Sequence, residues 1–214
     1  MLRAIVTCGP AYEPIDNVRR ITNHATGEIG TLLSDALTHA GFSVVCFRGE
    51  LATHPLLPRL ARVIPFSTNG DLLESLEASD PATAVVFHAA ALCDFQVTSV
   101  RVNGSEAAGA KLSSSASRID LTLEPAPKIL PELRRIFPRA KVVSWKYELE
   151  GDRDAAIARA VAQLTAGYAD ASVVNGSAYG PGFGFCEAGS WRVHFERKEA
   201  LAECLAGWAD GMNA

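Results

Sequence analysis

Apolar and β-branched residues gather in short runs along this 214-residue chain, and amphipathic stretches separate the runs. Six runs have the length and composition of strands: 4–8, 43–48, 62–66, 84–89, 141–147 and 171–175. Four stretches between them carry apolar positions at helical spacing: 28–40, 69–78, 126–137 and 153–167. Gly41 is well placed to end the first of these helices. The alternation predicts a doubly wound α/β fold, a Rossmann-like three-layer arrangement around a mostly parallel sheet.

Two segments break this alternation. Residues 95–118 are rich in Ser, Gly and Ala with little apolar periodicity, so they predict a mobile loop and a candidate flap. Toward the end of the chain, a glycine-rich segment precedes SWRVHF, which predicts a last strand before a C-terminal helix that begins around Arg197. No internal repeat is evident, and we expect a single domain over residues 1–214 that includes the flap.

The composition is that of an ordinary globular protein, with 48% hydrophobic and 21% charged residues. A formal charge of -4 and scattered Lys and Arg argue against a nucleic-acid partner. No apolar stretch approaches the roughly 20 residues that cross a bilayer. The N-terminus lacks the features of a signal peptide, so we expect a cytoplasmic protein. The five cysteines include no C-x-x-C pair, which predicts buried thiols and no metal centre.

The loop after the first predicted strand has the features of an anion-binding site. In AIVTCGPAYEPIDNVRRITNHATGEIG, residues 4–30, a strand ends in a glycine-bearing turn and a helix follows. Backbone N–H groups and the helix N-terminus can therefore face a phosphate. Gly9, Gly27 and Gly30 are too widely spaced for the G-x-G-x-x-G turn of a dinucleotide-binding protein. This spacing disfavours a plain Rossmann dehydrogenase.

Two polar residues of this loop each have two readings. The Asn23 amide either holds a carbonyl or phosphate oxygen of a ligand or caps the following helix. The Arg19 guanidinium, next to Arg20, either forks onto a phosphate or stays in solvent. The spacing of these residues leaves both pairs of readings open.

A second candidate site follows the fourth predicted strand, in FHAAALCDF at residues 87–95. Ligands of open α/β sheets lie outside the carboxyl ends of the strands, and the small side chains of Ala90 and Ala91 allow a ligand close to the backbone there. Asp94 is therefore favoured as a site carboxylate over a simple turn residue. His88 is favoured as a packed histidine, because no partner lies at metal-ligand spacing.

Three further residues are placed to reach the same crevice. Lys111 is the one lysine of the candidate flap, where it either closes over a phosphate or stays a solvated surface residue. Trp145 lies at the end of the fifth predicted strand, and its ring either faces a base or packs in the core. Asn175 ends the sixth predicted strand, before the glycine-rich segment, and faces the expected ligand crevice.

Five segments together resemble, in order and spacing, the phosphopantothenoylcysteine synthetase family, also called phosphopantothenate–cysteine ligase. They are VTCGPAYEPIDNVRRITNHATGEIG, HAAALCDFQV, AKLSSSASRIDLTLEPAPKIL, VVSWKYELEG and ASVVNG. The resemblance covers essentially the whole chain, and the agreement of five separate segments makes it specific. It implies the synthetase alone, without the flavin-dependent decarboxylase domain that is fused to it in many bacteria.

The resemblance implies a coenzyme A biosynthesis ligase, a homodimer whose site is shared between subunits. A nucleoside triphosphate with Mg2+ would activate 4'-phosphopantothenate to an acyl-nucleotidyl anhydride with release of pyrophosphate, and the cysteine amine would then displace the nucleotide. By motif match, Asn23 would hold the acyl group and Lys111 would close over the reacting phosphate. The other matches are nucleotide positions at Gly9, Gly27, Gly30, Trp145 and Asn175, and substrate positions at Arg19, across the dimer interface, and at Ala90, Ala91 and Asp94.

Local departures from the bacterial motifs resemble the eukaryotic branch of the family. The flap reads Lys111-Leu112-Ser113-Ser114 where bacterial members have K-x-K-K, and residues 126–130 and 144–149 differ in the same sense. That branch uses ATP, so the resemblance implies ATP, with the CTP of the fused bacterial enzymes as the alternative. Pro10 and Ala11 replace a glycine and a threonine of the family's first loop, which leaves fewer donors for phosphate.

Three other functions stay open. A paralogous ligase would keep the fold and the activation chemistry but join a different acid or amine, and the altered first loop and flap support it. A non-catalytic nucleotide-binding protein would release no pyrophosphate. An NAD(P)-dependent reductase would oxidise or reduce nicotinamide instead.

Overall fold

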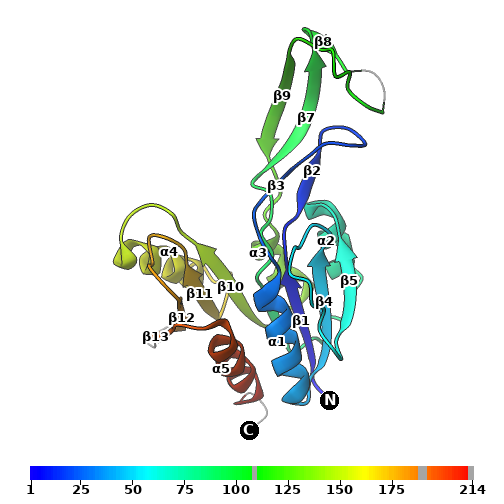
Figure 1. Ribbon diagram of the computed structural model, residues 1–214. Helices are drawn as coiled ribbons and strands as arrows, with labels where there is room; N and C mark the ends of the chain where they lie inside the picture. Colours follow the sequence, from blue (N-terminus) through cyan, green and yellow to red (C-terminus); the bar gives the residue numbers. More distant parts are fainter. Residues whose placement is uncertain (108–109, 188–191, 212–214) are drawn as a thin grey trace.

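A central eight-stranded sheet organises the computed structural model, which describes residues 1–107, 110–187 and 192–211 (Figure 1). The strand order is β13-β12-β11-β10-β6-β1-β4-β5. The parallel strands are β1 (Arg3–Cys8), β4 (Ser43–Gly49), β5 (Arg62–Phe66), β6 (Val85–His88), β10 (Lys141–Tyr147) and β11 (Ala171–Asn175). Two antiparallel strands, β12 (Phe183–Glu187) and β13 (Arg192–Phe195), extend the sheet at one edge.

Helices cover both faces of this sheet, as Figure 1 shows. One face is covered by α1 (Glu28–His39) and α5 (Lys198–Asp210). The other is covered by α2 (Asn69–Glu77), α3 (Ile129–Ile136) and α4 (Arg153–Thr165). Neighbouring residues of β1 show the division, because Ile5 packs in the cluster with α2 to α4 and Val6 in the cluster with α1 and α5. The predicted three-layer α/β fold is confirmed.

The six predicted strands and the four predicted helices all form, with boundaries close to those expected. The largest helix shift is at α3, which begins at Ile129 rather than at residue 126. Pro127 disfavours helical backbone at the residue before it. Lys128 is also extended, with φ -88° and ψ 117°, and serves as the N-cap. The C-terminal helix begins at Lys198 with Arg197 as its N-cap, as predicted.

The first part of the expected loop at 95–118 forms strands of a β-sheet arm, so the prediction is wrong for residues 95–106. β7 (Phe95–Val102) pairs in antiparallel fashion with β9 (Ile119–Pro125), and β8 (Ser105–Glu106) pairs with the end of β7. Together they form a separate three-stranded sheet that projects from the body (Figure 1). The turn between β7 and β8 is Asn103-Gly104, both with positive φ, and Asn-Gly is a hairpin signal that the sequence already carried.

Three further strands lie in segments where none was predicted. Within the first loop, β2 (Tyr12–Pro14) and β3 (Arg20–Thr22) form a short hairpin. Within the glycine-rich segment lies β12, where a Cβ at Gly184 would come within 2.8 Å of the Tyr179 ring. This close approach explains why glycine, normally unfavourable in strands, is used there. The predicted last strand is β13, and Ser190 and Trp191 of SWRVHF lie outside the described residues.

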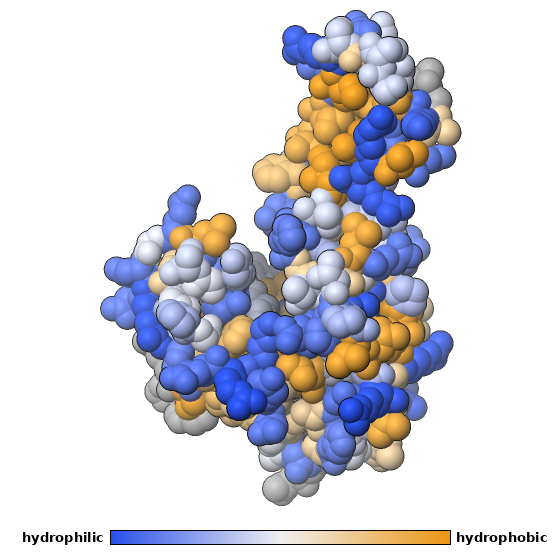
Figure 2. All heavy atoms as spheres, viewed as in Figure 1, coloured by the Kyte–Doolittle hydropathy of each residue, from blue (hydrophilic) through white to orange (hydrophobic). Residues whose placement is uncertain are grey.

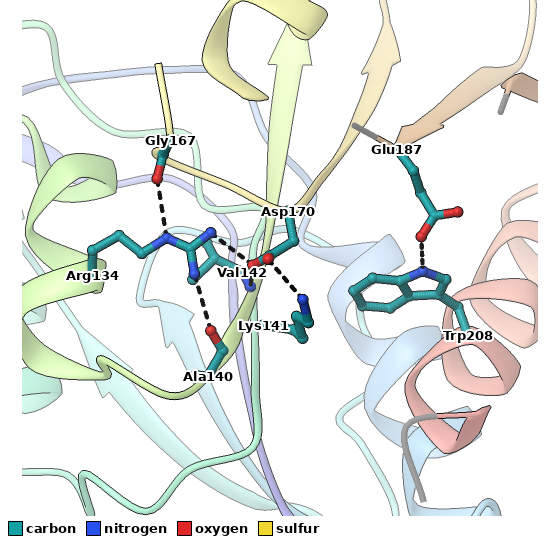
Figure 3. Close-up of polar contacts among 8 residues, drawn as sticks. All are labelled: Arg134, Ala140, Lys141, Val142, Gly167, Asp170, Glu187 and Trp208. Atoms are coloured by element: carbon teal, nitrogen blue, oxygen red, sulfur yellow. Dashed lines mark hydrogen bonds and ion pairs between the residues drawn. The ribbon is translucent and has the colours of Figure 1, made fainter. Parts of the chain in front are cut away.

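A polar network ties the helices to the amino ends of β10 and β11 (Figure 3). The Arg134 guanidinium of α3 donates to the carbonyls of Gly167 and Ala140, each at 3.1 Å, and to the Asp170 carboxylate at 2.7 Å. Asp170 also accepts from the backbone N–H of Val142 at 2.8 Å and from Lys141 at 3.0 Å. Burial alone would raise the pKa of Asp170, but these donors outweigh it and lower the pKa below its usual value.

A second contact in Figure 3 joins α5 to the antiparallel edge, where the Trp208 indole N–H donates to the Glu187 carboxylate. None of the five cysteines forms a disulfide with a described residue. Four are buried, as predicted, and Cys204 is half-buried. Within the described ranges, no helix has the length and apolar character needed to cross a membrane.

Candidate functional site

The carboxyl ends of the parallel strands form one edge of the sheet, and most of the predicted site residues follow them. Gly9 comes directly after β1, and Ala90 and Ala91 come after β6. Trp145 lies near the carboxyl end of β10, and Asn175 is the last residue of β11. These four strands are neighbours in the order β11-β10-β6-β1. The structure therefore brings these predicted residues to one crevice edge, where open α/β sheets bind ligands.

The loops after β1 and β6 are bound to each other through their backbones. The N–H of Ala91 donates to the Gly9 carbonyl, and the N–H of Ala11 donates to the Ala91 carbonyl, both at 3.0 Å. The N–H of Ala90 donates to the Thr7 hydroxyl at 3.3 Å. Because these polar groups are already paired, the two alanines offer a ligand mainly a small, flat contact surface.

Gly9 and Gly27 form a glycine floor at the start of α1. Their φ angles are 74° and 78°, in the left-handed region that favours glycine. A Cβ at Gly9 would lie 2.8 Å from the Cβ of Ala52, and a Cβ at Gly27 would lie 3.0 Å from the same atom and 3.6 Å from the Gly9 Cα. The two glycines thus lie together, although 18 positions separate them in the sequence. Bare backbone beside a helix N-terminus suits a phosphate.

Gly30 has a different role from the other two glycines. It is buried in the first turn of α1, and a Cβ there would lie 2.2 Å from the Cβ of Cys8 and 2.5 Å from its sulfur. The absence of a side chain therefore lets α1 pack closely on the end of β1. Gly30 therefore sets how closely α1 packs on β1. Gly9 and Gly27 are buried as well, so burial alone does not separate the three glycines.

Asn23 crosses from the first loop to the loop after β6. Its side-chain N–H donates to the backbone carbonyl of Leu92 at 2.7 Å, while the side chain stays exposed. The N-cap of α1 is Gly27, so the alternative reading of Asn23 as the helix cap is wrong. The Thr22 hydroxyl fixes the same crossing by donating to the Ala11 carbonyl at 2.7 Å. Asn23 therefore lies beside Ala90, Ala91 and the crevice.

A cavity of about 210 Å3 opens beyond Leu92, lined by residues from β6, β10 and the start of α3. The Asp94 carboxylate pairs with the Lys128 ammonium at its mouth, and both side chains are mostly exposed. Trp145 packs against the core cluster of α1 and α5, as its core reading predicts, and it also lines the cavity, where its contact with a base stays a prediction. Sequence reasoning missed Lys128 because it was read as part of a helix.

His88 lies at the inner side of this cavity as a buried, neutral histidine. Its Nδ1 is 2.9 Å from the Thr7 hydroxyl, and burial lowers its pKa to about 4. These features match the prediction of a packed histidine. The ring therefore carries no charge at neutral pH and can present only neutral hydrogen-bonding groups to a ligand.

Asn175 and Arg48 carry buried polar atoms that no described residue pairs. The Asn175 side-chain oxygen is one, while its backbone carbonyl accepts from the N–H of Glu148 at 2.9 Å. The Arg48 Nε is the other, although the same guanidinium donates to the His54 carbonyl at 2.6 Å. A Cβ at Gly27 would be 3.5 Å from that Nε, so this cation lies beneath the glycine floor. Buried unpaired groups are costly and favour a ligand that pairs them.

Arg48 was missed by sequence reasoning, and only strand register could have found it. It stands opposite Cys8 in the parallel pairing of β1 with β4, one residue before Gly9. An arginine at the end of an otherwise apolar strand, VVCF, was the available signal.

Arg19 and Lys111 lie at the arm rather than at the sheet edge, Lys111 on the arm itself and Arg19 on the β2–β3 loop that contacts it. Arg19 is in the loop between β2 and β3, and its guanidinium donates to the Asp16 carboxylate at 2.5 Å and to the Leu112 carbonyl at 3.3 Å. Lys111 is exposed on the segment between β8 and β9. In Figure 1 this segment and the β2–β3 loop lie side by side beyond the sheet. The structure thus forms two groups of predicted residues, one at the crevice and one at the arm.

Figure 2 shows a hollow between the base of the arm and the lobe that carries α4 and β10 to β12. The open α/β sheet, with the glycine floor, the N-terminus of α1 and a cavity along its carboxyl edge, defines the class of fold: a doubly wound α/β protein with a candidate ligand site at that edge. The chain belongs to the family described as DNA/pantothenate metabolism flavoprotein C-terminal domain, whose model matches residues 1–201. The family expected from the five sequence segments is confirmed.

Curated relatives agree with this family. The chain is 28% identical over 175 residues to the coenzyme A biosynthesis bifunctional protein CoaBC of Thermococcus kodakarensis, an alignment that covers 81% of this chain and 41% of the relative. CoaBC of Methanocaldococcus jannaschii is 30% identical over 162 residues, covering 76% of this chain and 37% of the relative. The chain therefore spans about two fifths of the length of these relatives.

Solved structures share the fold over nearly the whole chain. The DNA/pantothenate metabolism flavoprotein from Streptococcus pneumoniae has a TM-score of 0.85 at 24% identity, covering 99% of this chain and 100% of that one. A Cab2 mutant in complex with phosphopantothenate-cysteine has a TM-score of 0.74 at 17% identity, covering 99% of this chain and 86% of that one. At these identities the similarity establishes the α/β fold.

Proposed function

We propose that this chain is a phosphopantothenate–cysteine ligase of coenzyme A biosynthesis. The observation that carries the proposal is the Asn23 crossing, which joins the glycine floor to the loop of Ala90, Ala91 and Asp94. A nucleotide bound at the glycine floor and an acid bound in the cavity would then both lie next to Asn23. Family membership and the Cab2 complex with phosphopantothenate-cysteine support the same substrates.

The proposed reaction has two steps that this crevice suits. In the first, a carboxylate oxygen of phosphopantothenate attacks the α-phosphorus, and the bond from that phosphorus to pyrophosphate breaks. In the second, the amine of cysteine attacks the acyl carbon, loses a proton, and the nucleoside monophosphate leaves. Asn23 would hold the acyl group, while the bare backbone of Gly9 and Gly27 and the charge of Arg48 would face the phosphates.

ATP is the nucleotide that we propose, with CTP as the alternative. The unpaired side-chain oxygen of Asn175 is an acceptor, and both adenine and cytosine carry an exocyclic amine that can donate to it. Trp145, on the neighbouring strand, could offer its ring to the base. Mg2+ would enter bound to the triphosphate, as the resemblance to the family implies.

We further propose that the chain acts as a homodimer, because Arg19 and Lys111 lie at the arm while Asn23 lies at the crevice. The arm carries exposed apolar side chains, with Phe95 53%, Ile119 41% and Leu123 45% exposed. Figure 2 shows this apolar surface over the arm. Apolar surface of this kind favours association. A second subunit covering it would allow the arm of one chain to serve the crevice of the other.

The dimer is tested by Leu123→Glu, which should convert the protein to a monomer on size-exclusion chromatography with light scattering. Thr122→Glu is the matched control, because successive side chains of β9 point to opposite faces. A dimer that survives Leu123→Glu but not Thr122→Glu contradicts the proposed face. Cytoplasmic location is proposed as well, in keeping with five cysteines that form no disulfide with a described residue.

The proposed activity is tested by incubating the protein with phosphopantothenate, cysteine, Mg2+ and either ATP or CTP, and analysing the products by mass spectrometry. The expected product is the phosphopantothenate–cysteine amide. Pyrophosphate should form without cysteine only when the acid, the triphosphate and Mg2+ are all present. Release with a different acid would favour a paralogous ligase, whereas nucleotide binding without any release would favour a non-catalytic protein.

A further inference from the structure

The Asp16 carboxylate connects the loop between β2 and β3 to the segment that carries Lys111. Its side chain is only 1% exposed. One oxygen accepts from the backbone N–H groups of Val18 at 2.7 Å and Arg19 at 2.6 Å. The other accepts from the Arg19 guanidinium at 2.5 Å and from the backbone N–H of Leu112 at 2.9 Å. A single carboxylate therefore receives four donors from two distant parts of the chain.

Further contacts fix the segment on both sides of Lys111. The backbone N–H of Asn17 donates to the Ala110 carbonyl at 3.0 Å, and the Arg19 guanidinium donates to the Leu112 carbonyl at 3.3 Å. The Leu112 side chain is buried, while Lys111 between these anchors is exposed. The Lys111 backbone is thus held against the loop of Arg19, and its ammonium is left to reach a ligand.

We propose that Asp16 is a positioning residue that holds Lys111 and Arg19 in fixed relation, so that both cations act as one unit. This inference rests on the proposed ligase function, in which Lys111 faces the reacting phosphate and Arg19 the substrate phosphate. Two cations on separate flexible loops would lose conformational entropy on meeting one doubly phosphorylated complex. A shared anchor removes much of that cost before the ligand binds.

The chemistry of the anchor requires a carboxylate. Each oxygen of Asp16 accepts from two donors, which only an acceptor with two equivalent oxygens can do. In Asp16→Asn, one oxygen becomes an NH2 group. That group must face either the two backbone N–H groups or the guanidinium and the Leu112 N–H. Either orientation sets donors against donors.

The test compares Asp16→Asn with Asp120→Asn in the full chain. Asp120 is a matched control, because it is also a carboxylate on the arm that accepts from an arginine, Arg118, at 2.7 Å. Its side chain lies on the face of β9 opposite to Ile119 and Leu123. Amide hydrogen exchange of Leu112, followed by NMR without any ligand, should speed up by about tenfold or more in Asp16→Asn and stay unchanged in Asp120→Asn.

The catalytic readout is pyrophosphate release at saturating ATP, measured in Asp16→Asn, Lys111→Ala and the double variant. Asp16→Asn should slow release by about tenfold to a hundredfold and raise KM for phosphopantothenate, with cooperative unfolding retained. In the Lys111→Ala background, Asp16→Asn should slow release less than in the wild type, because the part of its effect that passes through Lys111 is already lost and only the part through Arg19 remains. Equal slowing in both backgrounds would overturn the proposal.

The two readouts separate this inference from the ligase assignment. If the wild-type chain releases no pyrophosphate, the proposed function fails, while the exchange rate of Leu112 still decides whether Asp16 anchors the segment. If the wild-type chain is active but Leu112 exchanges equally fast in wild type and Asp16→Asn, the anchor is absent and the inference fails alone.

Discussion

The side-chain amide of Asn23 donates to the backbone carbonyl of Leu92 at 2.7 Å, across 69 residues of sequence. This bond closes one side of the crevice, because it joins the loop that leads into α1 with the loop that follows β6. An asparagine in this position can donate to the protein and still present its oxygen, or its second N–H, to a ligand.

Asn23→Asp should slow pyrophosphate release by on the order of tenfold to a thousandfold, because a carboxylate cannot donate to Leu92 and repels the acyl phosphate. Asn103→Asp is the matched control, since its side-chain oxygen is the acceptor for Ser117 and Arg118 and Asp keeps that acceptor. Single-turnover assays of both variants check the expectation. An unimpaired first half-reaction in Asn23→Asp would remove Asn23 from the acyl site.

Lys111→Ala should lower turnover by on the order of a hundredfold while changing the free energy of unfolding by less than about 0.5 kcal/mol, as for other exposed side chains. Lys141→Ala gives the opposite pattern, because Lys141 pairs with Asp170 at the far end of the sheet. Denaturant unfolding and steady-state kinetics on both variants provide the comparison. Comparable losses of stability and turnover in Lys111→Ala would indicate a structural lysine.

Gly30→Ala should destabilise the fold by about 1–3 kcal/mol, because the added Cβ would lie 2.2 Å from the Cβ of Cys8 and must push α1 away from β1. Gly207→Ala in α5 is the control, since nothing lies within 4 Å of its added Cβ. That change should stabilise the protein by about 0.5–1 kcal/mol through helix propensity. Chemical denaturation measures both, and a neutral Gly30→Ala would refute the close-packing role.

Asp170→Asn should lower the free energy of unfolding at neutral pH by about 1–3 kcal/mol, because it weakens the network of Arg134, Lys141 and Val142. The pKa of Asp170 is lowered in the folded state, so its contribution is present above the unfolded pKa of about 3.9 and is lost as pH falls through the folded pKa. The stabilities of the wild type and the variant should therefore converge in acid.

Glu77→Gln is the control, because Glu77 forms an exposed pair with Arg135. It should change stability by at most about 1 kcal/mol. A stability gap between wild type and Asp170→Asn that stays constant down to pH 2 would contradict this assignment.

Much of the α/β body was predictable because buried parallel strands read as continuous apolar runs and their helices as amphipathic stretches. The arm was not, because β7 is only partly buried and β9 is largely exposed, so neither strand shows a fully buried face. The small polar residues between the two strands also made the alternation of apolar and polar positions hard to recognise in the sequence. The hairpin of β2 and β3 is three residues per strand, too short for any periodicity to show.

The crevice residues could be predicted because strand order fixes which loops meet, and Gly9, Ala90 and Asn175 all follow strands. Lys128 and Arg48 could not, since their proximity to Asp94 and Gly27 depends on where α3 begins and on strand register. Asp16 was equally hidden, because its partner Leu112 is 96 positions away and nothing local in the sequence pairs them.

Helix α1 begins at Glu28, and its N-cap is Gly27, a residue with no side chain to cap the first turn. A phosphate bound there would accept from the N–H groups of the first turn in place of a capping side chain. Ligand binding would therefore also stabilise the helix. Saturation at about 100 times Kd adds roughly 2.7 kcal/mol to stability by mass action. Heat denaturation in the presence of nucleotide can thus report occupancy even in variants that turn over no substrate.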